Sequence, residues 1–200
     1  MPNWARRCLA TQSRKIVMEE SLKDLWAASY DGWINVPGAD GVVYSRPLRD
    51  ETNSPSLQYP ASVLSSRLFA VGAWNPMGQL VTDEENDAAH DKIKATVRSI
   101  ELPEGCWYRH SFGFSINWRE PGYVFASPPE QADATRKIVL DLATQFKQGA
   151  IYEYEPITDK PHALLRKTVH CLMSSTVDAD VIVIRSDQPC MANSVPFGLD

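Results

Sequence analysis

Four polar side chains are the best candidates for chemistry in this chain: the amides of Asn75, Asn86 and Gln148 and the carboxylate of Glu120. Together with Trp74 they form our candidate ligand-binding site, because amides and carboxylates offer both hydrogen-bond donors and acceptors. Such a site would suit a small polar ligand or an exposed main chain. We expect no catalytic residue, because none of these groups is a nucleophile beside a base.

Each candidate also has a structural interpretation. Asn75 precedes Pro76, which favours an extended backbone, and its side chain can bond the turn. Asn86 can bond the preceding loop, and Glu120, before Pro121, can bond a neighbouring N–H of its own turn. The spacing of these residues along the chain does not decide whether they converge.

The histidines and cysteines show no metal-ligand spacing, and no Cys-x-x-Cys pair is present. They are His90, His110, His162, His170, Cys8, Cys106, Cys171 and Cys190. The glycines do not form a phosphate-binding loop. We therefore expect no metal site and no cofactor.

Residues 67–156 show the clearest pattern of helices and strands. Apolar periodicity and end signals predict, in order, a strand at Leu68–Trp74, a helix from Thr82 to Ile100, strands at Trp107–Ser115 and Gly122–Ala126, a helix from Ser127 to Phe146, and a strand at Ala150–Glu155. Each helix begins with a capping-box pattern, and Gly149 is expected in a left-handed conformation after the second. This order predicts an α+β fold, a ferredoxin-like βαββαβ sandwich with both helices on one face of the sheet.

The segments on either side predict extensions of this core. Residues 1–66 suggest a basic arm, a short helix at Glu19–Tyr30 and a loop-rich wrap. Residues 157–200 suggest a β-hairpin extension, with strands at Ala163–Val169 and Val181–Arg185, followed by a tail. The three segments 1–66, 67–156 and 157–200 are therefore our expected division of the chain.

Four short motifs in the central segment resemble a known family. They are Ala73-Trp74-Asn75-Pro76-Met77-Gly78, Glu84-Glu85-Asn86, Trp118-x-Glu120-Pro121 and Phe146-x-Gln148-x-Ala150. Over about residues 68–154 the chain is similar to the domain-of-unknown-function family numbered 3293. That family has no agreed activity, so the resemblance implies a boundary for the folded segment and a list of residues, but no reaction.

Composition limits the classes of function. The net charge is −5, but residues 1–18 carry +4 and the remaining chain carries −9. The acidic body disfavours nucleic-acid binding, and no apolar run approaches the roughly 20 residues of a membrane span. We expect an intracellular, soluble protein of the cytoplasm or of an organelle, where the basic N-terminus would suit a plastid or mitochondrion.

Two functions remain open on the sequence alone. The first is a non-catalytic binding or assembly protein, such as an accessory subunit of a complex, with protein partners contacted through the terminal extensions. The alternative is an enzyme or sensor that acts on a small polar metabolite or nucleotide through Asn75, Asn86, Glu120 and Gln148. Convergence of these four side chains, and what they bond, would discriminate the two.

Overall fold

The computed structural model describes residues 31–35, 42–48, 57–115, 118–172 and 180–186. Its elements are β1 (Asp31–Asn35), β2 (Val42–Pro47), α2 (Ala61–Leu64), β3 (Arg67–Gly72), η1 (Pro76–Gly78), α3 (Asp83–Arg98), β4 (Trp107–Ser115), β5 (Trp118–Ser127), η2 (Pro129–Gln131), α4 (Ala132–Gln145), β6 (Ala150–Pro156), β7 (Ala163–His170) and β8 (Val181–Ser186). The predicted basic arm, the helix at 19–30 and the C-terminal tail lie outside the described residues.

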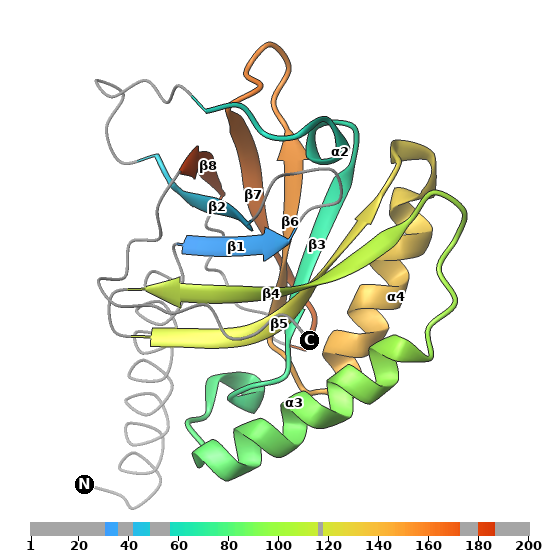
Figure 1. Cartoon of the computed structure of the whole chain (residues 1–200). Coiled ribbons are helices and arrows are strands. Elements are labelled where there is room, and N and C mark those ends of the chain that lie inside the picture. Colours follow the sequence, from blue (N-terminus) through green and yellow to red (C-terminus); the bar gives the residue numbers. More distant parts are fainter. Residues whose placement is uncertain (1–30, 36–41, 49–56, 116–117, 173–179, 187–200) are drawn as a thin grey trace, which may run out of the picture.

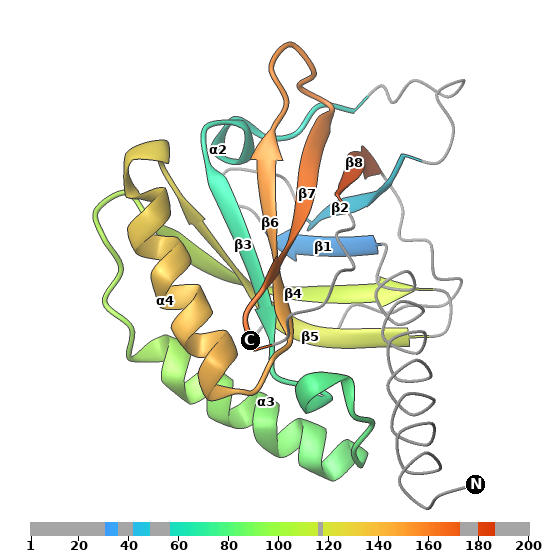
Figure 2. The ribbon, with the colours of Figure 1, turned by 180° about the vertical axis from the view of Figure 1, so that it is seen from behind.

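The strands form a closed antiparallel barrel in the order β1-β2-β8-β7-β6-β3-β5-β4 (Figure 1). Closure is made by β1 and β4, where Gly32 lies opposite Gly113 and Ile34 opposite Ser111. Helices α3 and α4 both lie on the outside of the barrel and are inclined to each other (Figure 2), and their buried residues pack against β3, β5 and β6. The predicted strands near 163–169 and 181–185 are present as β7 and β8, which pair with each other.

The expected ferredoxin-like sandwich is wrong. The six elements of residues 67–156 occur in the predicted order, but their four strands are only half of a larger sheet. Strands from before residue 67 and after residue 156 continue that sheet until it meets itself at the β1–β4 pair. Because a closed barrel has no free edges, the flanking strands complete the main sheet instead of forming separate extensions.

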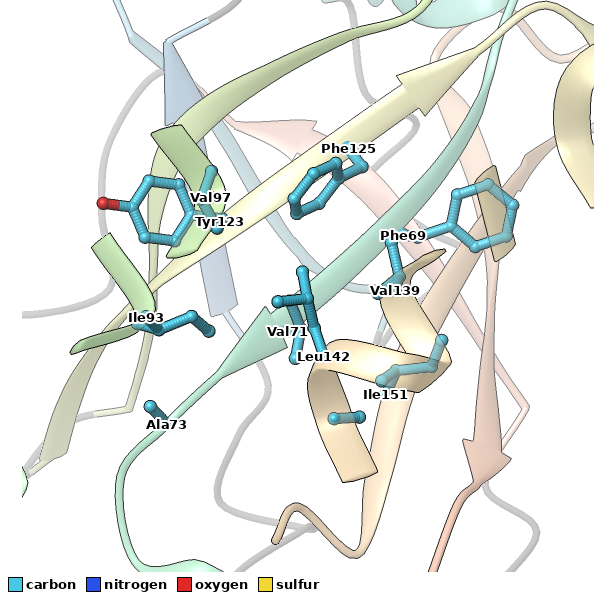
Figure 3. Close-up of a cluster of buried hydrophobic side chains, with 11 residues drawn as sticks. Phe69, Val71, Ala73, Ile93, Val97, Tyr123, Phe125, Val139, Leu142 and Ile151 are labelled. Atoms are coloured by element: carbon cyan, nitrogen blue, oxygen red, sulfur yellow. The ribbon is translucent and has the colours of Figure 1, made fainter. Parts of the chain in front are cut away.

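Two apolar clusters lie on the two faces of the barrel wall. Neighbouring residues of one strand alternate between them, with Leu68 in the interior cluster and Phe69 in the cluster beneath the helices. The outer cluster joins β3, β5 and β6 to α3 and α4 (Figure 3) and contains Phe69, Val71, Ala73, Ile93, Val97, Tyr123, Phe125, Val139, Leu142, Ala143 and Ile151. Both helices are therefore part of the hydrophobic core, which fixes their positions on the barrel wall.

The two helices begin differently. The capping box of α3 is confirmed, because the Thr82 side chain accepts the Glu85 N–H and Glu85 Oε2 accepts the Thr82 N–H. The second predicted capping box is wrong, since the short helix η2 precedes α4 and the cap of neither is bonded by a side chain. Ser127 ends β5 instead, with its hydroxyl buried and without a partner among the described residues.

Candidate functional site

The candidate residues meet where β3 leaves the barrel wall. After Gly72 the chain passes through Trp74 and Asn75, makes the single turn η1, and enters α3. We call residues 75–81 the 75–81 loop. The capping box fixes the first turn of α3, and that turn directs the buried Asn86 side chain back toward the start of this loop.

Asn75 and Asn86 form a two-point pair. The main-chain N–H of Asn75 donates to Asn86 Oδ1 at 2.8 Å, and Asn86 Nδ2 donates to Asn75 Oδ1 at 3.2 Å. Asn75 is left-handed, with φ 48° and ψ 63°, so the expected extended backbone is wrong. Asparagine tolerates this region better than most residues, and the two bonds to Asn86 offset the remaining strain. The same Oδ1 also accepts the Val81 N–H at 3.4 Å.

Gln148 holds the same turn from the end of α4. Its Nε2 donates to the carbonyl of Trp74 at 3.1 Å and to that of Phe146 at 3.2 Å. One residue earlier, the Lys147 carbonyl accepts the Met77 N–H at 2.7 Å. The segment that follows α4 is therefore joined to the 75–81 loop by both side-chain and main-chain bonds.

The sequence suggested that Gly149 would be the left-handed residue after α4, and this is wrong. The left-handed residue is Lys147, with φ 54°. The chain turns two residues earlier than expected, and this brings the Lys147 carbonyl to Met77, which is itself left-handed at φ 55°. Non-glycine residues in this region are uncommon, and they persist only where surrounding contacts hold them. Two such residues joined by a hydrogen bond indicate a rigid connection.

Glu120 reaches the turn from β5. Its carboxylate accepts the main-chain N–H of Trp74, and it lies so close to Gly72 that a Cβ on that glycine would overlap Oε1. Burial of the carboxyl group raises its pKa from 4.5 to about 8, and the bond from the Trp74 N–H opposes this only in part. The Glu120 side chain is therefore a neutral acid at neutral pH.

All five predicted site residues are thus brought together. Asn86, Glu120 and Gln148 bind main-chain groups of the other two, Trp74 and Asn75. Glu120 binds the N–H of Trp74, Gln148 binds its carbonyl, and Asn86 binds the N–H of Asn75. The chain leaves its strand here, so these groups have no partner on a neighbouring strand. Three side chains from α3, β5 and the end of α4 replace that partner.

Two groups of the site keep unused hydrogen-bonding capacity. The indole Nε1 of Trp74 is buried and has no partner among the described residues. The protonated carboxyl of Glu120 has an O–H to donate, because its bond with the Trp74 N–H uses only acceptor capacity. These two groups are the ones that a ligand could still engage.

Sequence reasoning missed three contributors to this site: Gly72, Met77 and Lys147. A signal for Gly72 was present, because a glycine inside a strand often marks the close approach of another group. The left-handed Met77 and Lys147 have no comparable signal, because neither residue type favours that conformation. In the part of the chain that the structure describes, no group of three or more His, Cys, Asp or Glu side chains could hold a metal ion.

The fold and site together define the class: an antiparallel eight-stranded barrel with two helices on its wall and a polar cluster that fixes one loop at its end. Residues 71–151 match the family described as a protein of unknown function, DUF3293, which confirms the resemblance over this segment. That stretch runs from β3 to β6 and includes every residue of the candidate site. No curated protein and no solved structure gives a significant match. Among the described helices, none is long and apolar enough to cross a membrane.

Proposed function

We propose that the protein is a non-catalytic protein-binding module and that the 75–81 loop is its contact element. One observation carries the proposal: three side chains from separate elements bind the main chain of Trp74 and Asn75, and so fix the shape of the loop. A loop held in a strained conformation by its surroundings is typical of a functional site. Pre-organisation lowers the entropic cost of binding, which favours recognition by a partner.

The loop presents an apolar group to solvent. Leu80 is 79% exposed, the highest value among the large hydrophobic side chains that the structure describes. Leu172, at 44%, lies at the same end of the barrel, because the Cys171 N–H bonds the Gly149 carbonyl beside the Lys147–Met77 connection. An apolar side chain on a rigid loop suits an anchor that enters a pocket on a folded protein.

Co-purification from the native source tests this proposal. The tagged protein is compared with the variants Leu80→Asp and Ile182→Asp, the second being a control on β8 with an exposed side chain. We expect a stoichiometric protein partner with the wild type and with Ile182→Asp, and its loss with Leu80→Asp. Absence of any stoichiometric partner, or a partner that Leu80→Asp retains, would reject the proposal.

A second candidate function rests on the unused groups of Trp74 and Glu120. The indole N–H and the acid O–H are both donors, so a small polar ligand rich in acceptors would suit them. Thermal shift with a metabolite panel tests this candidate, using Trp74→Phe, which removes the indole N–H and keeps a smaller aromatic ring. A ligand that stabilises the wild type and not Trp74→Phe would support small-molecule binding; equal shifts, or none, would reject it.

A further inference from the structure

His90 and His110 point the same ring nitrogen at each other across the interface of α3 with the barrel wall. His90 lies in α3 and His110 in β4, and their Nε2 atoms are 3.4 Å apart. Twenty residues separate them in the sequence, so no local motif reveals the pair. Both residues are half-buried.

Aromatic neighbours fix both imidazole rings. The His90 ring stacks on Tyr123, with centroids 6.0 Å apart and planes inclined by 11°. The His110 ring meets Tyr123 edge-on at 5.4 Å and Phe112 edge-on at 4.9 Å. Because Tyr123 and Phe112 are themselves buried in the barrel wall, the two nitrogen atoms are held in position before anything binds.

Burial favours the neutral form of both rings. Burial lowers the pKa of His90, and burial together with the neighbouring His90 and Lys94 lowers the pKa of His110 to about 4. The charged and titratable groups that act on the pair are Asp87, Asp91 and Lys94 from α3 and Tyr123 from β5.

The separation of the two nitrogens fits a long hydrogen bond, and it also fits a shared metal ion. An N–H hydrogen bond is usually about 2.9–3.0 Å long, and the 3.4 Å between the two Nε2 atoms lies at the long end of hydrogen-bond distances. Two Zn–N bonds of about 2.05 Å that meet at a tetrahedral angle of about 109° place their nitrogens roughly 3.3 Å apart. The observed spacing therefore matches two corners of a tetrahedral site.

We propose that His90 and His110 bind a divalent transition-metal ion such as Zn²⁺ through their Nε2 atoms. Imidazole is a ligand that suits Zn²⁺, Cu²⁺ and Ni²⁺ and not Mg²⁺ or Ca²⁺. Among the described residues no third His, Cys, Asp or Glu joins the two histidines in a cluster, so solvent water would have to fill the remaining positions. The carboxylates of Asp87 and Asp91, whose charges act on His90, attract the cation to this side of α3.

The test is isothermal titration of the chelator-treated full chain with ZnCl₂ near neutral pH. Wild type is compared with His90→Gln, His110→Gln and the control His162→Gln, which changes a histidine outside the pair. We expect one Zn²⁺ per chain in wild type and in the control, and at least about a ten-fold weaker affinity in either pair variant. MgCl₂ should give no binding at the same concentration.

A second measurement keeps the proposal falsifiable if His110→Gln disturbs the aromatic packing. In NMR spectra of the wild type, Zn²⁺ should shift the imidazole signals of His90 and His110 together and leave those of His162 unchanged. His90→Gln should lose the Zn²⁺-induced rise in melting temperature, measured against the variant's own metal-free value. No binding up to about 1 mM Zn²⁺, or binding unchanged in both pair variants, would overturn the assignment.

Discussion

Asn86 supports Asn75 from eleven residues away, accepting its main-chain N–H and donating to its side chain. This reciprocal pair joins the first turn of α3 to the residue where β3 leaves the barrel. Each amide therefore satisfies a group that would otherwise be left unpaired at a strained position. The stability and shape of the 75–81 loop should depend on it.

Replacing Asn86 with alanine should lower the free energy of unfolding by about 1–3 kcal/mol, because the part-buried N–H of Asn75 loses its acceptor. Urea unfolding followed by circular dichroism measures the loss. Asp87→Ala is the matched control, since Asp87 is the exposed neighbour in the same turn, and it should change stability by less than about 0.5 kcal/mol. Equal effects of the two changes would contradict the bond's structural role.

Because the backbone of Asn75 is left-handed, glycine should be tolerated better than alanine at this position. Asn75→Gly keeps the N–H that Asn86 accepts and removes the steric cost of φ 48°, whereas Asn75→Ala keeps that cost. Both lose the side-chain bonds. We expect Asn75→Gly to be more stable than Asn75→Ala by about 1 kcal/mol in chemical denaturation. The reverse order would show that the residue is extended in solution.

The raised pKa of Glu120 predicts a fall in stability with rising pH. The folded state holds a proton up to about pH 8, while the unfolded chain releases it near 4.5, so this stabilisation is complete below pH 4.5 and is lost as pH rises to 8. The loss should be on the order of 5 kcal/mol.

Glu120→Gln isolates this contribution, because the amide resembles the protonated acid and can still accept the Trp74 N–H. Thermal unfolding from pH 5 to pH 9 should show the wild type losing stability relative to the variant. The two curves should approach each other at the acid end. Parallel curves across that range would indicate an ordinary, ionised carboxylate.

Gly122 should tolerate no side chain. It lies opposite Gly72 in the β3–β5 pair, and a Cβ there would lie 2.6 Å from the main-chain oxygen of Val71. Because a neighbouring strand must move to make room, Gly122→Ala should destabilise the barrel by about 2–3 kcal/mol in urea unfolding.

Gly72→Ala is the comparison for this prediction. Its added Cβ meets the carboxyl end of Glu120, a side chain that can move at the expense of its bond to the Trp74 N–H. The loss of stability should therefore be smaller than for Gly122→Ala. A larger loss would show that Glu120 cannot leave its position.

Much of the local structure was predictable from the sequence. Apolar periodicity located α3, α4 and β3 to β8, and the Thr82–Glu85 pattern marked the start of α3. These features depend on residues close together in the chain, so local sequence determines them. The candidate residues were chosen from motifs that resemble the family, and the family match covers the segment that contains them, residues 71–151.

The closure of the barrel and the bonds of the site were decided by the tertiary structure. β1 pairs with β4 across about 80 residues, and no local pattern specifies such a partner. The same is true of Glu120 at the Trp74 N–H and of His90 facing His110. The sequence alone determined which segments become helices and strands, and it indicated which polar residues are candidates for a site. Only the packing of distant segments decided that those residues bind a main-chain turn, because long-range contacts are set by how the whole sheet curls.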